Sequence, residues 1–302
     1  MNEAIPEFLS EMLIKEYGNE LTNQIVEGYK LKRVTTFRAN TLKTNAEEVE
    51  NTLIKLKIKY EKSQWNKEAF IIRNESADTI KEIDIYKEGK IYLQSLSSML
   101  PPIILNPKEK ENILDMAAAP GGKTTQMASL SDNKAMITAC EKNKIRAERL
   151  KYNLDKQGAT RVSIMLKDSR KLDNFFSFDK ILLDAPCSGS GTISINNKKQ
   201  CELFTKELIE RSVKTQKELI KKASKILKLG GVLIYSTCSI LKEENENIIK
   251  EILKNGEMEL VPIDKEIFKG VPELPVTIEG TMCICPSKMY EGFFVAKLVK
   301  VK

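Results

Sequence analysis

The chain has 302 residues, of which 41% are hydrophobic and 30% are charged, a balance typical of an ordinary soluble globular protein. The net charge of +7 favours polyanionic partners only weakly, because 42 acidic residues are interspersed with the 49 basic ones. The lack of histidine is more informative, since it excludes Ser–His and Cys–His catalytic pairs and every histidine-containing metal site.

The sequence carries no sign of export or of membrane insertion. No apolar run approaches the ~18–20 residues that span a bilayer, and the N-terminus lacks the basic start and apolar core of a signal peptide. Six cysteines are spread along the chain without a dense framework, which fits a reducing compartment. We therefore expect a cytoplasmic protein, without a metal site or a membrane partner, that acts as a monomer.

Residues 1–95 predict a small α+β domain, which we expect to bind the RNA. Two short helices are expected within residues 6–30, where apolar side chains recur at roughly helical spacing, and a β-like run with basic residues follows. A helix capped by Asn45 and a strand at residues 69–74 complete this part.

Residues 96–302 predict a larger α/β domain. Residues 92–105 are expected to form a joining helix that Pro101 and Pro102 stop. Downstream, short apolar strands alternate with helices, a pattern that favours a doubly wound, mostly parallel sheet of Rossmann-like type. The strands are expected at 112–117, 134–141, 161–168, 178–186 and 230–238. The last apolar run, 291–300, is expected to complete the edge of the sheet.

Ligands of such a sheet bind beyond the carboxyl ends of its strands. Polar side chains stand at several predicted strand ends, namely Asp115, Glu141, Asp168, Asp184, Cys187 and Cys238. Four acids and two thiols are too much polar material for a purely structural rim. We therefore expect a ligand or reaction site there.

The stretch "DMAAAPGGKTT" (115–125) is a turn of small residues between the first strand of this sheet and its helix. It can be a turn that needs glycine only for its shape, or a P-loop, which requires glycine where Ala117 stands. A third interpretation is an S-adenosylmethionine (SAM) turn, in which small residues and a helix N-terminus approach the ligand. Glu141 would then bind the ribose hydroxyls and Asp168 the adenine amine, and acids at successive strand ends favour this interpretation.

A cysteine after an apolar strand is usually a small buried hydrophobic residue. Considered alone, either Cys187 or Cys238 would be interpreted in this way. Both, however, lie in turns with glycine, serine or threonine at the expected ligand rim. A thiolate there can add to C6 of a pyrimidine, and the addition makes C5 able to take a methyl group from a sulfonium donor. Asp184 is the carboxyl group nearest in sequence for bonding the ring N3, and the second thiol can assist release.

Several segments together resemble the Sun/Nop family of RNA (cytosine-C5) methyltransferases over nearly the whole chain. They are "RANTLKT" (38–44), "LQSLSSML" (93–100), "DMAAAPGGKT" (115–124), "DAPCSGSGT" (184–192), "YSTCSILKEENE" (235–246) and "EGFFVAKL" (291–298). The resemblance implies the class I methyltransferase fold and SAM as the cofactor. The residues it assigns to SAM binding are Ala117, Ala118, Ala119, Pro120, Gly121, Gly122, Lys123, Glu141, Asp168 and Asp184.

The resemblance also assigns roles to the two thiols. The nucleophile of the family maps to Cys238, and Cys187 is linked to release of the covalent intermediate. The residues alone would favour Cys187 as the nucleophile, because a Pro–Cys turn has that role in DNA cytosine methyltransferases. Since no histidine can deprotonate Cys238, we hypothesise that Lys123 and the cofactor sulfonium offset the opposing charge of Asp184.

A base inside a duplex cannot be reached, so the target cytosine must be unpaired or flipped out. Arg38 and Asn40 lie in a family-like motif and are expected to contact the RNA backbone. Ribosomal and transfer RNA both fit, and small-subunit rRNA is favoured because bacterial members more often act on it. Two other functions stay open on the residues, a P-loop-like NTPase and a catalytically idle RNA-binding protein.

Overall fold

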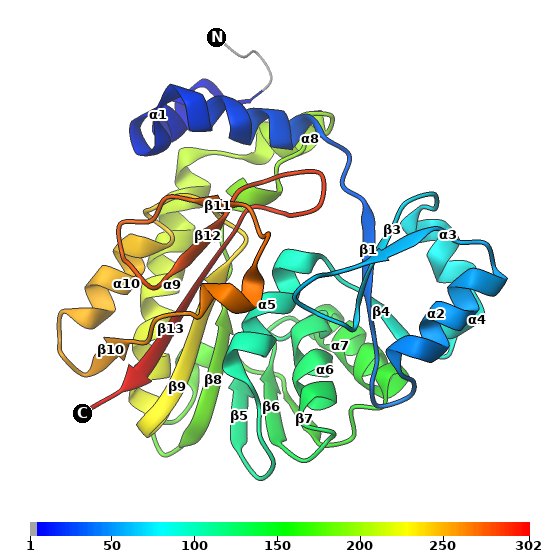
Figure 1. Ribbon diagram of the computed structural model, residues 1–302. Coiled ribbons are helices and arrows are strands. Elements are labelled where there is room, and N and C mark those ends of the chain that lie inside the picture. Colours follow the sequence, from blue (N-terminus) through cyan, green and yellow to red (C-terminus); the bar gives the residue numbers. More distant parts are fainter. Residues whose placement is uncertain (1–4) are drawn as a thin grey trace.

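Helix α1 (Glu7–Lys30) opens the computed structural model, which describes residues 5–302 (Figure 1). The sequence predicted two short helices here, and the structure joins them into one element bent at Gly18, whose φ of 76° suits glycine. Tyr29 of α1 is buried in the same core as Phe294, near the C-terminus. Helix α1 therefore packs with the larger part of the molecule, and the domain boundary near residue 95 stays a prediction.

A small antiparallel sheet follows, with strand order β2-β3-β1-β4. Its strands are β1 (Thr35–Ala39), β2 (Tyr60–Lys62), β3 (Ala69–Ile72) and β4 (Ile91–Leu93). Its helices are α2 (Ala46–Lys55), α3 (Ala77–Glu82) and α4 (Asp84–Lys87). Helix α2 begins as predicted, because the Asn45 side chain accepts a hydrogen bond from the Glu48 N–H at 2.9 Å. The rings of Phe37 and Phe70 stack in the core that the sheet and helices share.

The larger sheet contains neighbouring parallel strands in the order β7-β6-β5-β8-β9. They are β5 (Asn112–Asp115), β6 (Met136–Cys140), β7 (Val162–Met165), β8 (Phe178–Asp184) and β9 (Leu227–Thr237). The connections hold α6 (Gly122–Leu130), α7 (Lys144–Gln157), η1 (Ser169–Lys171), η2 (Ser190–Thr192), α8 (Lys198–Leu203) and α9 (Lys206–Ile226). The strand order reverses between β5 and β8, which confirms the predicted doubly wound fold and puts a ligand crevice at that point.

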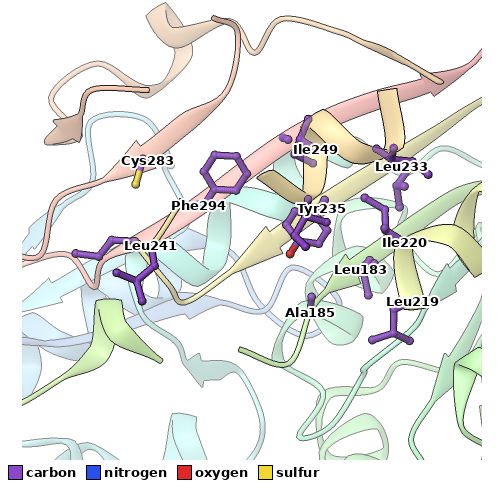
Figure 2. Close-up of a cluster of buried hydrophobic side chains, with 14 of the residues drawn as sticks. Leu183, Ala185, Leu219, Ile220, Leu233, Tyr235, Leu241, Ile249, Cys283 and Phe294 are labelled. Carbon is purple, nitrogen blue, oxygen red and sulfur yellow. The ribbon is translucent and has the colours of Figure 1, made fainter. Parts of the chain in front are cut away.

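Successive residues of a strand point to opposite faces of the sheet, so these apolar strands give the sheet two apolar faces. Helices cover both of them. Leu182 belongs to the core that contains α5 (Leu96–Leu105), α6 and α7, whereas Leu183 belongs to the core that contains α9 and α10 (Glu246–Leu253). Figure 2 shows part of the second core, in which side chains of β8, β9 and α9 meet. In the described part of the chain, none of these helices is long and apolar enough to span a bilayer.

Beyond β9 the sheet continues with antiparallel strands, so the whole sheet is mixed. The remaining elements are β10 (Met258–Leu260), η3 (Lys265–Phe268), β11 (Glu273–Leu274), β12 (Met282–Ile284) and β13 (Phe293–Lys300). The prediction that residues 291–300 form the sheet edge is wrong, because β13 lies between β9 and β12 and also pairs with β10. Phe293 and Phe294 are buried in opposite cores, as expected of an interior strand.

Helix α5 runs through Pro101 and Pro102, although the sequence predicted that these prolines would stop it. Pro102 lacks the N–H that would bond to the carbonyl oxygen of Ser98. The side chain of Gln94 donates a hydrogen bond to that oxygen instead, at 3.0 Å. This replacement lets the helix continue and holds Ser98 beside the ends of the central strands.

Candidate active site

The small-residue turn after β5 is tied down by Asp115, the last residue of that strand. Its carboxylate accepts hydrogen bonds from the Thr124 hydroxyl at 2.7 Å and from the Ala117 N–H at 3.4 Å. Burial raises the pKa of Asp115 to about 6, and the Thr124 hydrogen bond opposes that rise. Gly121 has a φ of 109°, and an added Cβ there would lie 2.9 Å from Leu150, so this position requires glycine.

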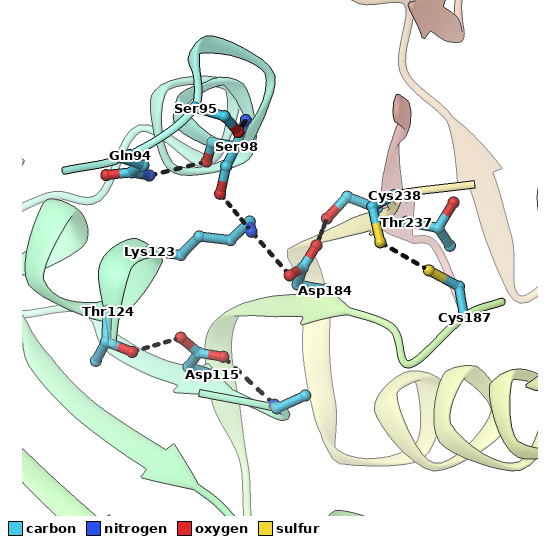
Figure 3. Close-up of polar contacts among 12 residues, drawn as sticks. Gln94, Ser95, Ser98, Asp115, Lys123, Thr124, Asp184, Cys187, Thr237 and Cys238 are labelled. Atoms are coloured by element: carbon cyan, nitrogen blue, oxygen red, sulfur yellow. Dashed lines mark hydrogen bonds and ion pairs between the residues drawn. The ribbon is translucent and has the colours of Figure 1, made fainter. Parts of the chain in front are cut away.

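Lys123 and Asp184 form an ion pair above the turn (Figure 3). The Lys123 ammonium donates to Asp184 Oδ2 at 2.8 Å and to the Ser98 hydroxyl at 2.7 Å. Asp184 Oδ1 accepts a further hydrogen bond from Ser236 at 2.8 Å. Burial is the largest single effect and lowers the pKa of Lys123, but the charge and hydrogen bond of Asp184, together with Cys238 and Asp115, outweigh it and leave that pKa above its ordinary value. The ammonium is therefore positively charged at neutral pH.

The two thiols predicted at the rim lie side by side. Cys187 follows β8 and Cys238 follows β9, and their sulfur atoms are 3.1 Å apart (Figure 3). The hydrogen bond to Cys238 and burial together raise the pKa of Cys187 well above its usual range. The Gly191 N–H donates to the Cys238 carbonyl at 3.0 Å, which joins the two loops through the backbone as well.

Two hollows flank the small-residue turn and both include Ala117. The larger, of about 260 Å³, reaches from the turn to the Lys123–Asp184 pair. The smaller, of about 50 Å³, is lined by Glu141 and Asp168. All the residues predicted to bind the cofactor, apart from Gly121, line one of the two. Within the described residues, no group of three or more Cys, Asp and Glu side chains is arranged to hold a metal ion.

The two rim acids of the smaller hollow are held by basic neighbours. Glu141 accepts a hydrogen bond from the Asn143 N–H at 2.9 Å, and Arg146 lies 3.3 Å from its carboxylate. Asp168 is paired with Arg170, whose guanidinium lies 2.6 Å from Oδ2. This contact lowers the pKa of Asp168 to about 2, so the carboxylate is ionised throughout the physiological range.

Arg38 and Asn40 disagree with the prediction that they contact RNA, because only 2% and 0% of these residues is exposed. Arg38 donates to the side chains of Gln94 and Thr125 at 2.9 and 2.8 Å. The Asn40 amide donates to main-chain carbonyls of the loop before β4 and of α7. Both side chains therefore join the small sheet to the larger domain, and the sequence motif that contains them has a structural role here.

A larger groove of about 800 Å³ adjoins the active-site hollow and shares Leu93 to Ser95 and Glu291 with it. The groove lies between the small sheet and the loop before β13. Its basic side chains are Lys32, Arg33, Arg73 and Lys288, and its acidic ones are Glu75, Asp78 and Glu291. This surface, and not that of Arg38, offers basic groups next to the reaction site.

Three residues of the site were missed by the sequence interpretation. Ser98 and Ser236 hold the Lys123–Asp184 pair from opposite sides, and Glu244 connects the two thiol loops. The segment around Glu244 contains three acids and resembles the exposed start of a helix, so its burial was not foreseeable from pattern.

With this geometry in view, the profile of a family described as 16S rRNA methyltransferase RsmB/F matches residues 102–299. A second profile, described as the RsmF/B-like ferredoxin-like domain, matches residues 5–77. The chain belongs to the RsmB/F methyltransferase family. The resemblance inferred from the sequence motifs is thus confirmed, as is the class I methyltransferase fold with a small N-terminal domain.

Relatives in the RsmB/F family differ in the RNA that their names specify. A tRNA (cytosine(72)-C(5))-methyltransferase of Pyrococcus horikoshii is 40% identical over 74% of this chain and 56% of its own length. A tRNA (cytosine(49)-C(5))-methyltransferase of Pyrococcus abyssi is 34% identical over 97% of this chain and 96% of its own length. A human 28S rRNA (cytosine(4447)-C(5))-methyltransferase is 35% identical over 92% of this chain but only 36% of its own length. The chain therefore spans about half or less of two of these relatives.

The crystal structure of NSun6 from Pyrococcus horikoshii with SFG has the same fold. It superposes on the present structure with a TM-score of 0.89 and 28% sequence identity, and the match covers 100% of both chains. The small N-terminal domain and the catalytic sheet of the RsmB/F family thus occur together in both proteins.

Proposed function

We propose that this chain is a SAM-dependent RNA (cytosine-C5) methyltransferase. The observation that carries the proposal is the contact between the Cys187 and Cys238 sulfur atoms, 3.1 Å apart, beside the Lys123–Asp184 ion pair. Two thiols and a carboxylate at one sheet edge supply a nucleophile, a release group and a hydrogen-bonding group for a pyrimidine ring. Membership in a family whose named relatives methylate cytosine C5 in rRNA and tRNA supports the same activity.

The hollows around the turn fit an adenosine-containing sulfonium compound. The donor set suits SAM, because the Glu141 carboxylate matches the ribose hydroxyls and Asp168 matches the adenine amine. Residues 117–122 would lie along the ligand backbone, since their side chains are small, and Asp184 would face its amino acid part. When bound, SAM supplies the methyl group as an electrophile next to the thiols.

The chain's own residues then act on the cytosine. The Cys238 thiolate forms a bond to C6, and the electron pair of the C5–C6 double bond moves into the ring. N3 takes up a proton from water as this charge develops, and the resulting N3–H donates a hydrogen bond to the Asp184 carboxylate, so that C5 is the atom that accepts the methyl group. The C5 and N3 protons then leave to water, and the electron pair of the C5–H bond re-forms the C5–C6 double bond. The Cys238–C6 bond breaks with Cys187 assisting, and its electron pair returns to the Cys238 sulfur. Lys123 neutralises Asp184 and so reduces its opposition to the thiolate.

The target base must be unpaired or flipped out to reach Cys238. The groove with Lys32, Arg33 and Lys288 supports binding of the RNA strand next to that base, because its basic groups complement phosphates and it is continuous with the active-site hollow. The named relatives include both tRNA and rRNA enzymes, so the proposal is made for structured RNA in general.

The two other functions considered from the sequence have less support. A P-loop would leave its lysine free for phosphates, whereas Lys123 is bound to Asp184 and Ser98. An idle RNA-binding protein would not need both thiols in contact. Calorimetric titration with SAM and with Mg²⁺–ATP distinguishes the methyltransferase from a P-loop NTPase. We expect heat of binding for SAM only.

Bisulfite sequencing of total RNA from cells with and without the gene tests the proposal directly. We expect at least one cytosine that resists conversion only when the gene is present, and its position identifies rRNA or tRNA as the substrate. Purified protein with SAM should restore that mark on RNA from the deleted strain. Identical conversion patterns in the two strains, together with no transfer in the purified system, would refute the proposed activity.

A further inference from the structure

A buried carboxylate lies beneath both thiol loops. Glu244 is 0% exposed and accepts hydrogen bonds from the Ser188 N–H at 2.7 Å and the Ser188 hydroxyl at 2.5 Å. It also accepts from the Ser239 hydroxyl at 2.6 Å and from the Gln216 amide at 3.2 Å. Burial raises the pKa of Glu244, and these hydrogen bonds oppose that rise by stabilising the ionised form.

The partners of Glu244 are the residues that directly follow the two thiols. Ser188 follows Cys187, and Ser239 follows Cys238, so one carboxylate fixes the start of both loops. The Ser190 and Ser239 hydroxyls, 2.8 Å apart, add a second connection between the loops. The pairing of β8 with β9 brings the two loops together, and these links fix the loops where the sulfur atoms are 3.1 Å apart.

We propose that Glu244 is a positioning residue that holds the two thiols in contact and keeps their shared proton on Cys187, leaving Cys238 as the nucleophile. The inference deepens the proposed function and rests on it for the role of the thiolate. Formation of the active state releases one of the two thiol protons to water. The other proton stays on Cys187, whose S–H group donates a hydrogen bond to the Cys238 sulfur.

The charges near the two thiols favour retention of the proton on Cys187 over retention on Cys238. The negative charge of Glu244 lies near Cys187 and disfavours a second negative charge there. Beside Cys238, the charges of Lys123 and Asp184 offset each other, so that no net charge there opposes a thiolate. The buried Tyr235 hydroxyl donates to the Glu244 carbonyl at 2.6 Å and carries no charge, so it does not remove this asymmetry.

Alkylation of the free protein tests the charge effect. Glu244→Gln keeps the size of the side chain and an acceptor for Ser188 but removes the charge. Iodoacetamide labelling between pH 6 and 10, read for Cys187 and Cys238 by mass spectrometry, reports the thiolate at each position. In the variant we expect Cys187 to titrate at a lower pH, which raises the ratio of Cys187 to Cys238 labelling several-fold.

Glu246→Gln is the matched control. Glu246 is also buried, but it bonds to the Thr277 N–H at 2.8 Å, away from the thiol loops. We expect the wild-type labelling ratio in this variant. An unchanged ratio in Glu244→Gln, or an equal change in Glu246→Gln, overturns the proposal.

A second variant tests the positioning itself and does not depend on the folding of Glu244→Gln. Ser188→Ala combined with Ser239→Ala removes both hydroxyl donors and keeps the charge. We expect diamide to join Cys187 and Cys238 several-fold more slowly than in the wild type, and an unchanged rate contradicts the positioning role. Both experiments use the free protein, so a lack of RNA methylation in the bisulfite test does not alter their outcome.

Discussion

The ammonium of Lys123 lies 2.8 Å from the carboxylate of Asp184, and Ser236 donates to the other oxygen of that carboxylate. This pair joins the helix after the small-residue turn to the strand that leads to Cys187. Asp184 is thereby neutralised electrostatically without losing its ability to accept a hydrogen bond. It can therefore stand beside a thiolate and still bind a pyrimidine ring.

Asp184→Asn should lower the rate of methyl transfer about 10²–10⁴-fold, the usual range for loss of an acid–base group. The asparagine carbonyl can still accept from Lys123, and its amide can donate to the Ser236 hydroxyl, so the fold should persist. Transfer of labelled methyl groups from SAM to RNA measures the effect. Asp179→Asn is the control, because Asp179 is the second residue of the same strand and pairs with Lys228. Equal rates for Asp184→Asn and the wild type would show that the carboxylate has no part in the reaction.

Cys187→Ala should trap a covalent protein–RNA complex, because addition of Cys238 to C6 proceeds while release is impaired. The complex should survive denaturing electrophoresis with labelled RNA. Cys238→Ala should give no such complex, since the nucleophile is absent.

Cys201→Ala serves as the control for these variants and should behave as the wild type. A complex that accumulates in Cys238→Ala and not in Cys187→Ala would exchange the roles of the two thiols. That outcome would favour the role that the Pro–Cys turn suggested from the residues alone.

Asp115 should make stability depend on pH in a defined direction. Its pKa is about 6 in the folded protein against 3.8 for an ordinary aspartate, so the folded state binds this proton more tightly than the unfolded state. Stability therefore falls as pH rises from about 4 to 6, and the full cost above pH 6 is roughly 3 kcal/mol.

Asp115→Asn removes this charge and should gain stability relative to the wild type, by about 1 kcal/mol more at pH 8 than at pH 5. Urea unfolding of both proteins at the two pH values measures the difference. A gain that is equal at both pH values would mean that Asp115 does not titrate in this window.

The central strands were predictable because both of their faces are buried. Residues such as Leu182 and Leu183 lie in opposite cores, which makes the strand a continuous apolar run in the sequence. Parallel strands place their carboxyl ends at the same edge of the sheet. The proximity of Cys187 and Cys238 at that edge could therefore be predicted as well. Phe293 and Phe294 likewise lie in opposite cores, and the apolar run that contains them has the pattern of an interior strand.

The remaining features depend on partners that are distant in sequence. Arg38 resembles a surface cation until its contacts with Gln94 and Thr125 are known. In α5, the carbonyl oxygen that Pro102 leaves without its helical partner accepts a hydrogen bond from the side chain of Gln94, which lies before the helix. Glu244 acts through the two loops that it joins. Pattern and spacing identify elements and their ends, whereas such single contacts require the fold.

The groove beside the active site leads to the last prediction. Lys32→Ala combined with Lys288→Ala should weaken RNA binding and lower the slope of log affinity against log salt by about 1.5, since each phosphate contact contributes about 0.7–0.9. Lys221→Ala combined with Lys254→Ala is the control, because these exposed lysines lie on α9 and just after α10. Both pairs remove the same charge, so a change confined to the first pair identifies the groove as the RNA path. Equal slopes for the two double variants would mean that RNA reaches Cys238 by another route.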